Sequence, residues 1–399
     1  MKKTNFILLI CLSCLFIPYE DAIQYLSHLL LIFVVLFFYD YYKLKPILYF
    51  YGYGMLAFCV QYIFLHQDVF LANYILSLVY APLLVLLYPS RKLDSYTIDL
   101  ERIINISFLI YAILLWYQAL TNWWTPESVG GVHGIIKGPH LNAQLYLLLS
   151  GYTLFKEGYK NKTYALFFLL TAILCSYNLA TLVFFVSVVL VLFVNVSLNK
   201  KYFKFLSIAG VVLIVGIFTL FKIVTEMNPY LLTMLSAIST DLGYSGKIGY
   251  VINYFTDYIQ QDFASFIIGT SPGNGGSRAA LLLTDNFLSV SIPDALISES
   301  FFVKENVYPY LYGVSDVTRG TINQPFSSLI ALISEYGIIA SLFFTKYLFR
   351  FYKKLQVKNK YSHNFLIINL VIWILFSHSL ELLPFIVLFH LLTLSNKIK

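Results

Sequence analysis

The feature that most constrains this chain is a series of continuous apolar runs, spread from its first residues to its last. Many of them reach about 18 residues, the length that an α-helix needs to cross the hydrocarbon core of a bilayer. The runs are continuous rather than alternating, so they exclude a membrane β-barrel. Only 12% of the residues are charged, against about 25% in soluble proteins. The sequence therefore predicts an all-α polytopic membrane protein.

The runs divide the chain into about twelve membrane helices and one long polar loop. We expect an N-terminal transmembrane bundle (1–222), an extracytoplasmic loop (223–325) and a C-terminal group of spans (326–399). The predicted spans cover 6–18, 22–42, 46–66, 69–88, 103–120, 141–155, 164–176, 179–197, 205–222, 326–349, 364–382 and 384–396. The spans 164–176 and 179–197 are kept separate, because merging them would invert every later connection.

Basic residues test the orientation of these spans. Most of the 27 lysines and arginines fall in every second connection, for example within 43–45, 156–162, 200–204 and 350–360. Because positively charged connections stay in the cytoplasm, both termini are predicted to be cytoplasmic and the long loop extracytoplasmic. The net charge of +7 follows from this distribution and does not indicate a nucleic-acid partner. The four cysteines lie inside apolar runs and are predicted to be core residues.

The polar interval 223–325 is the only long one in the sequence, and loops of that length are usually functional. It is rich in aromatic and aliphatic residues, so we expect it to be folded. Apolar residues at 248, 251, 252, 255 and 259 recur at helical spacing and predict an amphipathic helix. Further helices are predicted to start after Ser277, as an N-cap, and over 295–303.

The glycine-rich loop (269–277) is the sharpest motif in that interval. Its glycines allow backbone N–H groups to converge on an anion, and a helix is predicted to follow it. Arg278 at its edge would add a bidentate clamp for phosphate. The alternative is a flexible connector between two loop helices, and the motif alone does not separate the two. The loop residues predicted to contact a substrate are Gly273, Asn274, Gly275, Gly276 and Ser277.

Arg319 and Asp316 form a second polar group, just before the apolar helix predicted to start at Phe326. We predict that they reach the outer membrane surface near Arg278. The alternative is a solvated turn with an ordinary ion pair, which contributes little to stability.

Three more polar residues lie within apolar spans. Glu335 follows the long loop, and a carboxyl at that depth either faces a wet cavity or is neutral. His378 and Glu381 lie near the outer end of another span with no motif around them. We interpret His378 and Glu381 as structural.

A second outer segment, 121–144, contains His133, Lys137, His140 and Asn142. Polar groups that enter a span are costly, so they tend to be functional. The spacing of the two histidines, with no carboxylate or thiol nearby, argues against a zinc site. We predict acid–base or hydrogen-bonding roles for them, with packed, structural histidines as the alternative.

With these residues the chain resembles the O-antigen polymerase and ligase superfamily of bacterial polysaccharide assembly. Three segments carry the resemblance, namely 134–143, 268–273 and 324–340. The last of them includes Glu335 and Gly337 in a Glu-x-Gly pattern. Ligases of this superfamily typically begin the closing helix with His-Asn, where this chain has Phe326 and Ser327. That departure favours a polymerase and leaves the catalytic base unassigned.

The resemblance implies a membrane glycosyltransferase of GT-C-like architecture in the bacterial inner membrane. Such polymerases join undecaprenyl-diphosphate-linked repeat units into O-antigen or capsular polysaccharide. Donor and acceptor are then both lipid-linked glycans within the membrane lipid. A flippase and a chain-length-regulating co-polymerase are expected partners, and neither a cofactor nor a metal is expected.

In that reaction the superfamily's paired arginines can be carried over to Arg278 and Arg319, with Lys137 as a third cation for the diphosphate. Stabilising the departing charge is the largest help available, because pyrophosphate is already a good leaving group. His133, Asn142 and the glycine-rich loop would bind substrate. Candidates for the base that takes the acceptor proton are, in falling order, His140, Asp316 and Glu335.

Three other functions stay open on the sequence. An O-antigen ligase belongs to the same superfamily and differs in its acceptor. A flippase for lipid-linked oligosaccharides is usually built from two similar halves with short loops, whereas here one long loop lies late in the chain. A membrane acyltransferase needs a site open to a cytoplasmic donor, and the predicted cytoplasmic connections offer only lysine-rich segments.

Overall fold

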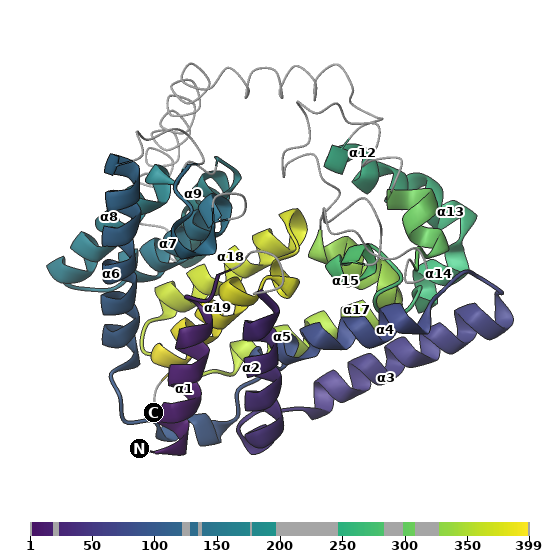
Figure 1. The fold of residues 1–399 in the computed structure, drawn as a ribbon, viewed down its shortest axis with the longest axis horizontal. Coiled ribbons are helices and arrows are strands. Elements are labelled where there is room, and N and C mark those ends of the chain that lie inside the picture. Colours follow the sequence, from purple (N-terminus) through teal and green to yellow (C-terminus); the bar gives the residue numbers. More distant parts are fainter. Residues whose placement is uncertain are drawn as a thin grey trace.

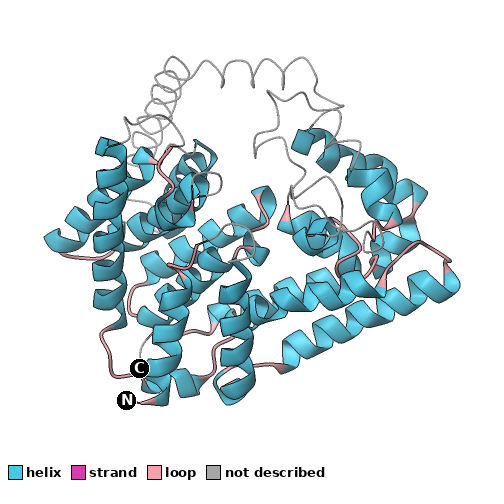
Figure 2. Ribbon diagram, viewed as in Figure 1, coloured by secondary structure: helices cyan, strands magenta, loops and turns pink. Residues whose placement is uncertain are grey.

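The structure, a computed structural model, describes residues 2–18, 24–121, 128–134, 138–175, 178–196, 246–282, 298–307 and 327–397. Over these residues the fold is helical (Figure 2), and its only β pairing is two isolated bridges, Tyr42 with Pro89 and Val357 with Lys397. The predicted all-α class is therefore confirmed for the described part of the chain.

The helices follow the apolar runs of the sequence. The first part of the chain contains α1 (Lys3–Cys14), α2 (Gln24–Phe37), η2 (Tyr39–Tyr41), α3 (Lys45–Cys59), η3 (Val60–Phe64), α4 (Leu71–Ser77), η4 (Leu78–Tyr80), α5 (Ala81–Leu86), η5 (Arg91–Ser95), α6 (Leu100–Thr121), η6 (Gly131–His133), α7 (Gly138–Leu154), α8 (Tyr159–Leu174) and α9 (Asn178–Val196). The predicted loop contains α12 (Gly246–Asn253), η8 (Tyr254–Tyr258), α13 (Ile259–Gln261), α14 (Phe263–Ile268), α15 (Arg278–Leu282) and η10 (Val303–Val307). The last part contains α17 (Ser328–Lys353), α18 (Lys360–Phe376), η12 (Ser379–Glu381) and α19 (Leu383–Ser395).

Among the described helices, three are long and apolar enough to cross a membrane: α3 with η3, α6 and α17. Other apolar helices, such as α1 and α19, are shorter. Helices lie at every predicted span except 205–222, which is outside the described residues. These lengths support membrane-helix character, while the number of spans and their orientation stay predictions.

The helices gather around α19, every residue of which is buried. α7 is also buried along almost its whole length, and it packs against α8, α9, α18 and α19 (Figure 1). One continuous cluster of buried apolar side chains runs from residues of α1 to residues of α19. The helices from the beginning and the end of the chain therefore share one core.

α3 and α4 run side by side away from this core, on the right of Figure 1. The Tyr51 hydroxyl donates to the Ser77 carbonyl at 3.2 Å, and the Tyr74 hydroxyl donates to the Tyr51 carbonyl at 3.2 Å. The helices of 246–282 cover the far end of the pair, where α15 contacts α4 and α14 contacts α17. Helices are present where the apolar spacing predicted one, as α12, η8 and α13, but the buried face consists of Tyr250, Tyr254 and Tyr258, whereas Ile252 and Phe255 are exposed.

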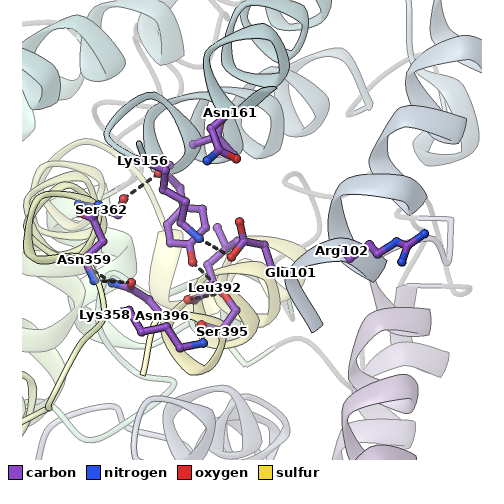
Figure 3. Close-up of polar contacts among 12 residues, drawn as sticks. Glu101, Arg102, Lys156, Asn161, Lys358, Asn359, Ser362, Leu392, Ser395 and Asn396 are labelled. Carbon is purple, nitrogen blue, oxygen red and sulfur yellow. Dashed lines mark hydrogen bonds and ion pairs between the residues drawn. The ribbon is translucent and has the colours of Figure 1, made fainter. Parts of the chain in front are cut away.

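A polar cluster ties together the helix ends nearest both termini (Figure 3). Lys156, just after α7, forms an ion pair with Glu101 in the first turn of α6. The backbone N–H of Asn359 donates to Asn396 Oδ1 at 3.0 Å, and Asn396 Nδ2 donates to the Asn359 carbonyl at 2.8 Å. These bonds fix α6, α7, α18 and α19 to one another at the end of the bundle that carries the predicted cytoplasmic lysines.

Candidate functional site

The site is built on a break in α17. Gly337 has a φ of +69°, so the helix stops being regular there and resumes after it. A side chain cannot replace this glycine, because a Cβ atom would lie 2.1 Å from the carbonyl oxygen of Ile267. The break removes the ordinary helical partners of the Ser334 and Glu335 carbonyls, which then need other donors.

The glycine-rich loop supplies those donors. The N–H of Thr270 donates to the Ser334 carbonyl at 2.7 Å, and the N–H of Ser271 donates to the Glu335 carbonyl at 3.0 Å. Gly269 permits this approach, since a Cβ atom on it would lie 2.4 Å from the Glu335 carbonyl oxygen. Irregular backbone at membrane depth is tolerated where protein surrounds it. The loop is buried and bonded, so the flexible-connector interpretation is wrong.

The turn between α3 and α4 holds the loop from the other side. Gln61 Nε2 donates to the Gly269 carbonyl at 2.8 Å. Asn274 Oδ1 accepts from the Phe70 N–H at 2.8 Å, and Asn274 Nδ2 donates back to the Phe70 carbonyl at 3.2 Å. A Cβ atom on Gly273 would lie 2.1 Å from the Asn73 carbonyl oxygen. Asn274 and Gly273 are thus buried against protein, and their contact with a substrate stays a prediction.

The predicted anion cradle exists, but it holds a carboxylate of the protein itself. The Gly275 N–H donates to Glu335 Oε1 at 3.3 Å, and the Gly276 N–H donates to Ser334 Oγ at 3.1 Å. Ser277 is the predicted N-cap, and its hydroxyl accepts from the Ala280 N–H at 3.2 Å. The N–H groups of Gly275 and Gly276 therefore point to Glu335 and Ser334, and phosphate binding by these groups stays a prediction.

Arg278 begins α15, and its backbone N–H donates to Glu381 Oε2 at 2.7 Å. The same carboxylate oxygen lies 3.7 Å from His378 Nδ1. The sequence does not predict that Glu381 is a partner of Arg278, because no motif surrounds Glu381. The one feature of the sequence that indicated a role for Glu381 was the energetic cost of placing a carboxyl group within an apolar span.

Glu335 and Glu381 line one small cavity, together with Ser277, Tyr51 and Tyr336. Its volume is about 50 Å³, enough for water but not for a sugar ring. Glu335 is only 4% exposed. The arrangement puts two carboxyl groups and an arginine at one end of α17, which can hold a proton and a negative charge close together.

His133 and Asn142 lie elsewhere, on the α6 side of the bundle. Asn142 Oδ1 accepts from the Tyr111 hydroxyl at 3.0 Å, and Asn142 Nδ2 donates to the Gly130 carbonyl at 2.8 Å. The fully buried His133 packs on the Tyr111 ring with centroids 5.8 Å apart, and burial lowers its pKa to about 4. They fix the 128–134 segment to α6 and α7, so the structure does not bring them to Arg278.

The other predicted site residues divide into two groups. His140 is a half-buried residue in the first turn of α7, on the same side of the bundle as His133. Lys137, Asp316 and Arg319 lie outside the described residues, and their roles stay predictions. Within the described ranges, no three histidine, cysteine, aspartate or glutamate side chains come together as a metal site would require.

The site thus consists of a broken α17, a buried glycine-rich loop that completes it, and Arg278 held beside two carboxyl groups. Its parts come from three distant stretches of the chain, near residues 60–73, 262–282 and 327–381. Compared with known proteins, the chain matches no protein-family model and no curated protein sequence.

Proposed function

We propose that the protein polymerises undecaprenyl-diphosphate-linked repeat units at the outer face of the bacterial inner membrane. In this proposal about twelve helices span the bilayer and both termini are cytoplasmic. The observation that carries the proposal is the meeting of Arg278 with Glu381 at the start of α15, beside the cavity that also contains Glu335. A cation next to a titratable carboxyl is what glycosyl transfer from a lipid diphosphate needs.

Arg278 would bind the diphosphate of the donor. The backbone N–H of Arg278 donates to Glu381 Oε2 at 2.7 Å, which fixes the start of α15 beside this carboxyl group. A guanidinium can pair with two phosphate oxygens at once and stabilise the charge that develops as the lipid diphosphate leaves. The cavity is too small for a sugar, so both glycans would approach from outside it.

Glu381 is our candidate for the base, ahead of the residues suggested by sequence alone. One of its carboxyl oxygens accepts from the Arg278 N–H, so it lies beside the residue that would bind the diphosphate. In the reaction, the acceptor hydroxyl oxygen forms a bond to the anomeric carbon of the donor. The bond from that carbon to the diphosphate breaks, and the acceptor proton moves to Glu381. Undecaprenyl diphosphate departs with the electron pair.

A flippase is the alternative from another class of protein. The break in α17 helps to distinguish a flippase from an enzyme. Transporters use broken helices to expose carbonyl groups to ions at the binding site. Here the carbonyls of Ser334 and Glu335 already accept from Thr270 and Ser271. That pairing favours a fixed enzyme site over an ion-coupled transport path.

The test is an assay with the purified full-length protein and a lipid-linked repeat unit. We expect a ladder of products that lengthens with time and is unchanged by a chelator. The matched substrate control is the same oligosaccharide as a methyl glycoside, which lacks the diphosphate and should act only as an acceptor. Transfer of one unit to lipid A-core alone would identify a ligase, and movement across the bilayer without bond formation would identify a flippase.

A further inference from the structure

A second cavity lies beyond Gly337, between α3 and the later half of α17. Its volume is about 610 Å³, and it opens between the two helices rather than into the core. Aromatic and aliphatic side chains form most of its lining, including Tyr49, Tyr53, Ile339 and Phe343. Tyr49 is 67% exposed and Phe343 is 66% exposed, so the outer side of this groove faces the surroundings of the protein.

One end of the groove is strongly basic. Lys45, Lys346 and Arg350 all line it, and none of the described residues that line it is acidic. Lys346 and Arg350 lie one turn apart on the same face of α17. Lys45 is the first residue of α3, and its ammonium lies 5.5 Å from the centre of the Tyr49 ring. The three cations therefore gather at the mouth of an apolar channel.

The length of the groove matches one leaflet of a bilayer. From Lys45 to Tyr53 the lining of α3 rises about 12 Å along the helix axis, at about 1.5 Å per residue. Half of the hydrocarbon core of a bilayer is roughly 15 Å thick. Lys45 and Arg350 lie near the ends of α3 and α17, where lipid headgroups would be found. A cation cluster at headgroup level with an aromatic channel beside it fits an anionic amphiphile.

We propose that this groove binds an anionic phospholipid of the leaflet at the basic ends of α3 and α17. Its phosphate lies among Lys45, Lys346 and Arg350, and one acyl chain lies between Tyr49 and Phe343. Basic pockets between membrane helices bind anionic headgroups in this way, with each cation worth about a fivefold gain in affinity. The inference does not depend on the proposed glycosyl transfer, because the α17 residues that line the groove follow Gly337, whereas those that line the cavity of Glu335 and Glu381 precede it.

Native mass spectrometry of the full-length protein tests the proposal, with phosphatidylglycerol and phosphatidylethanolamine as the two probes. We expect the protein to retain phosphatidylglycerol and to bind phosphatidylethanolamine at least about tenfold more weakly. The triple variant Lys45→Ala, Lys346→Ala, Arg350→Ala should lose this preference. The matched control is Lys3→Ala, Arg102→Ala, Lys160→Ala, which removes the same charge from exposed residues outside the groove and should keep it.

A cross-linking experiment on the wild-type protein covers the case in which the triple variant does not fold. Phosphatidylglycerol with a photoreactive acyl chain should label peptides of α3 and α17 on either side of the groove. Labelling elsewhere, equal retention of the two lipids, or equal loss in the groove and control variants would each overturn the proposal.

Discussion

Arg278→Lys is expected to abolish most polymer formation by the purified protein. Lysine keeps the charge but loses the planar fork that binds two phosphate oxygens together. Loss of such a contact to developing negative charge typically slows a reaction by roughly 100-fold to 1,000-fold. The measurement is the rate of chain growth on a lipid-linked repeat unit. Because the bond from residue 278 to Glu381 uses the backbone N–H, the substitution leaves that anchor in place.

The control for Arg278→Lys is Arg102→Lys, the same change at an exposed arginine in the first part of α6. Both variants should unfold at the wild-type temperature, and Arg102→Lys should keep wild-type chain growth. Polymer of normal length and rate from Arg278→Lys would remove Arg278 from the reaction and end the proposal that a guanidinium binds the diphosphate.

Gly337→Ala is expected to cause a large loss of stability. The new Cβ atom would lie 2.1 Å from the Ile267 carbonyl oxygen, and alanine would be held at a φ of +69°. To avoid this clash the glycine-rich loop must move away from the break in α17. The Ser334 and Glu335 carbonyls then lose their hydrogen bonds from Thr270 and Ser271. Buried groups left unpaired cost about 1–3 kcal/mol each, so the total loss is about 4 kcal/mol or more.

Gly52→Ala provides the matched comparison, because nothing lies within 4 Å of a Cβ atom at Gly52 in α3. That variant should be neutral or slightly stabilised, since alanine favours a helix by about 1 kcal/mol over glycine. Thermal unfolding and gel filtration in one detergent measure both variants. A Gly337→Ala protein as stable as Gly52→Ala would mean that the break in α17 is not required for the fold.

Local sequence signals predicted the elements around the site. The apolar periodicity placed α12 to α13 within the predicted loop, and Ser277 was identified as the cap of α15 from its position before a short apolar run. Glu335 was expected to be neutral or to face a wet cavity, and in the structure it lines a small cavity. Each of these inferences needs only neighbouring residues, because caps and periodicity are local properties.

Pairings across long stretches of chain could not be predicted in the same way. Arg278 and Glu381 are 103 residues apart, and Thr270 and Ser334 are 64 residues apart. A glycine-rich segment signals converging N–H groups, but it does not say which anion they hold. A substrate phosphate was one interpretation of the motif, whereas in the structure the Gly275 N–H donates to Glu335 and the Gly276 N–H donates to Ser334. The sequence identifies Gly337 only as part of the Glu-x-Gly pattern. Its role in breaking α17 is shown by its positive φ angle and by the loop that fills the break.

The pairing of loop and broken helix also has a consequence for how the chain is made. The first half of α17 would carry two bare carbonyls into lipid if it were inserted alone, which is costly. Its donors, Thr270 and Ser271, are synthesised before it. We therefore expect the loop with Thr270 and Ser271 to fold near the translocon first, and the first half of α17 to pack against it during co-translational insertion. Ribosomes stalled at successive lengths past Lys353 would reveal the moment at which the two halves become protected together.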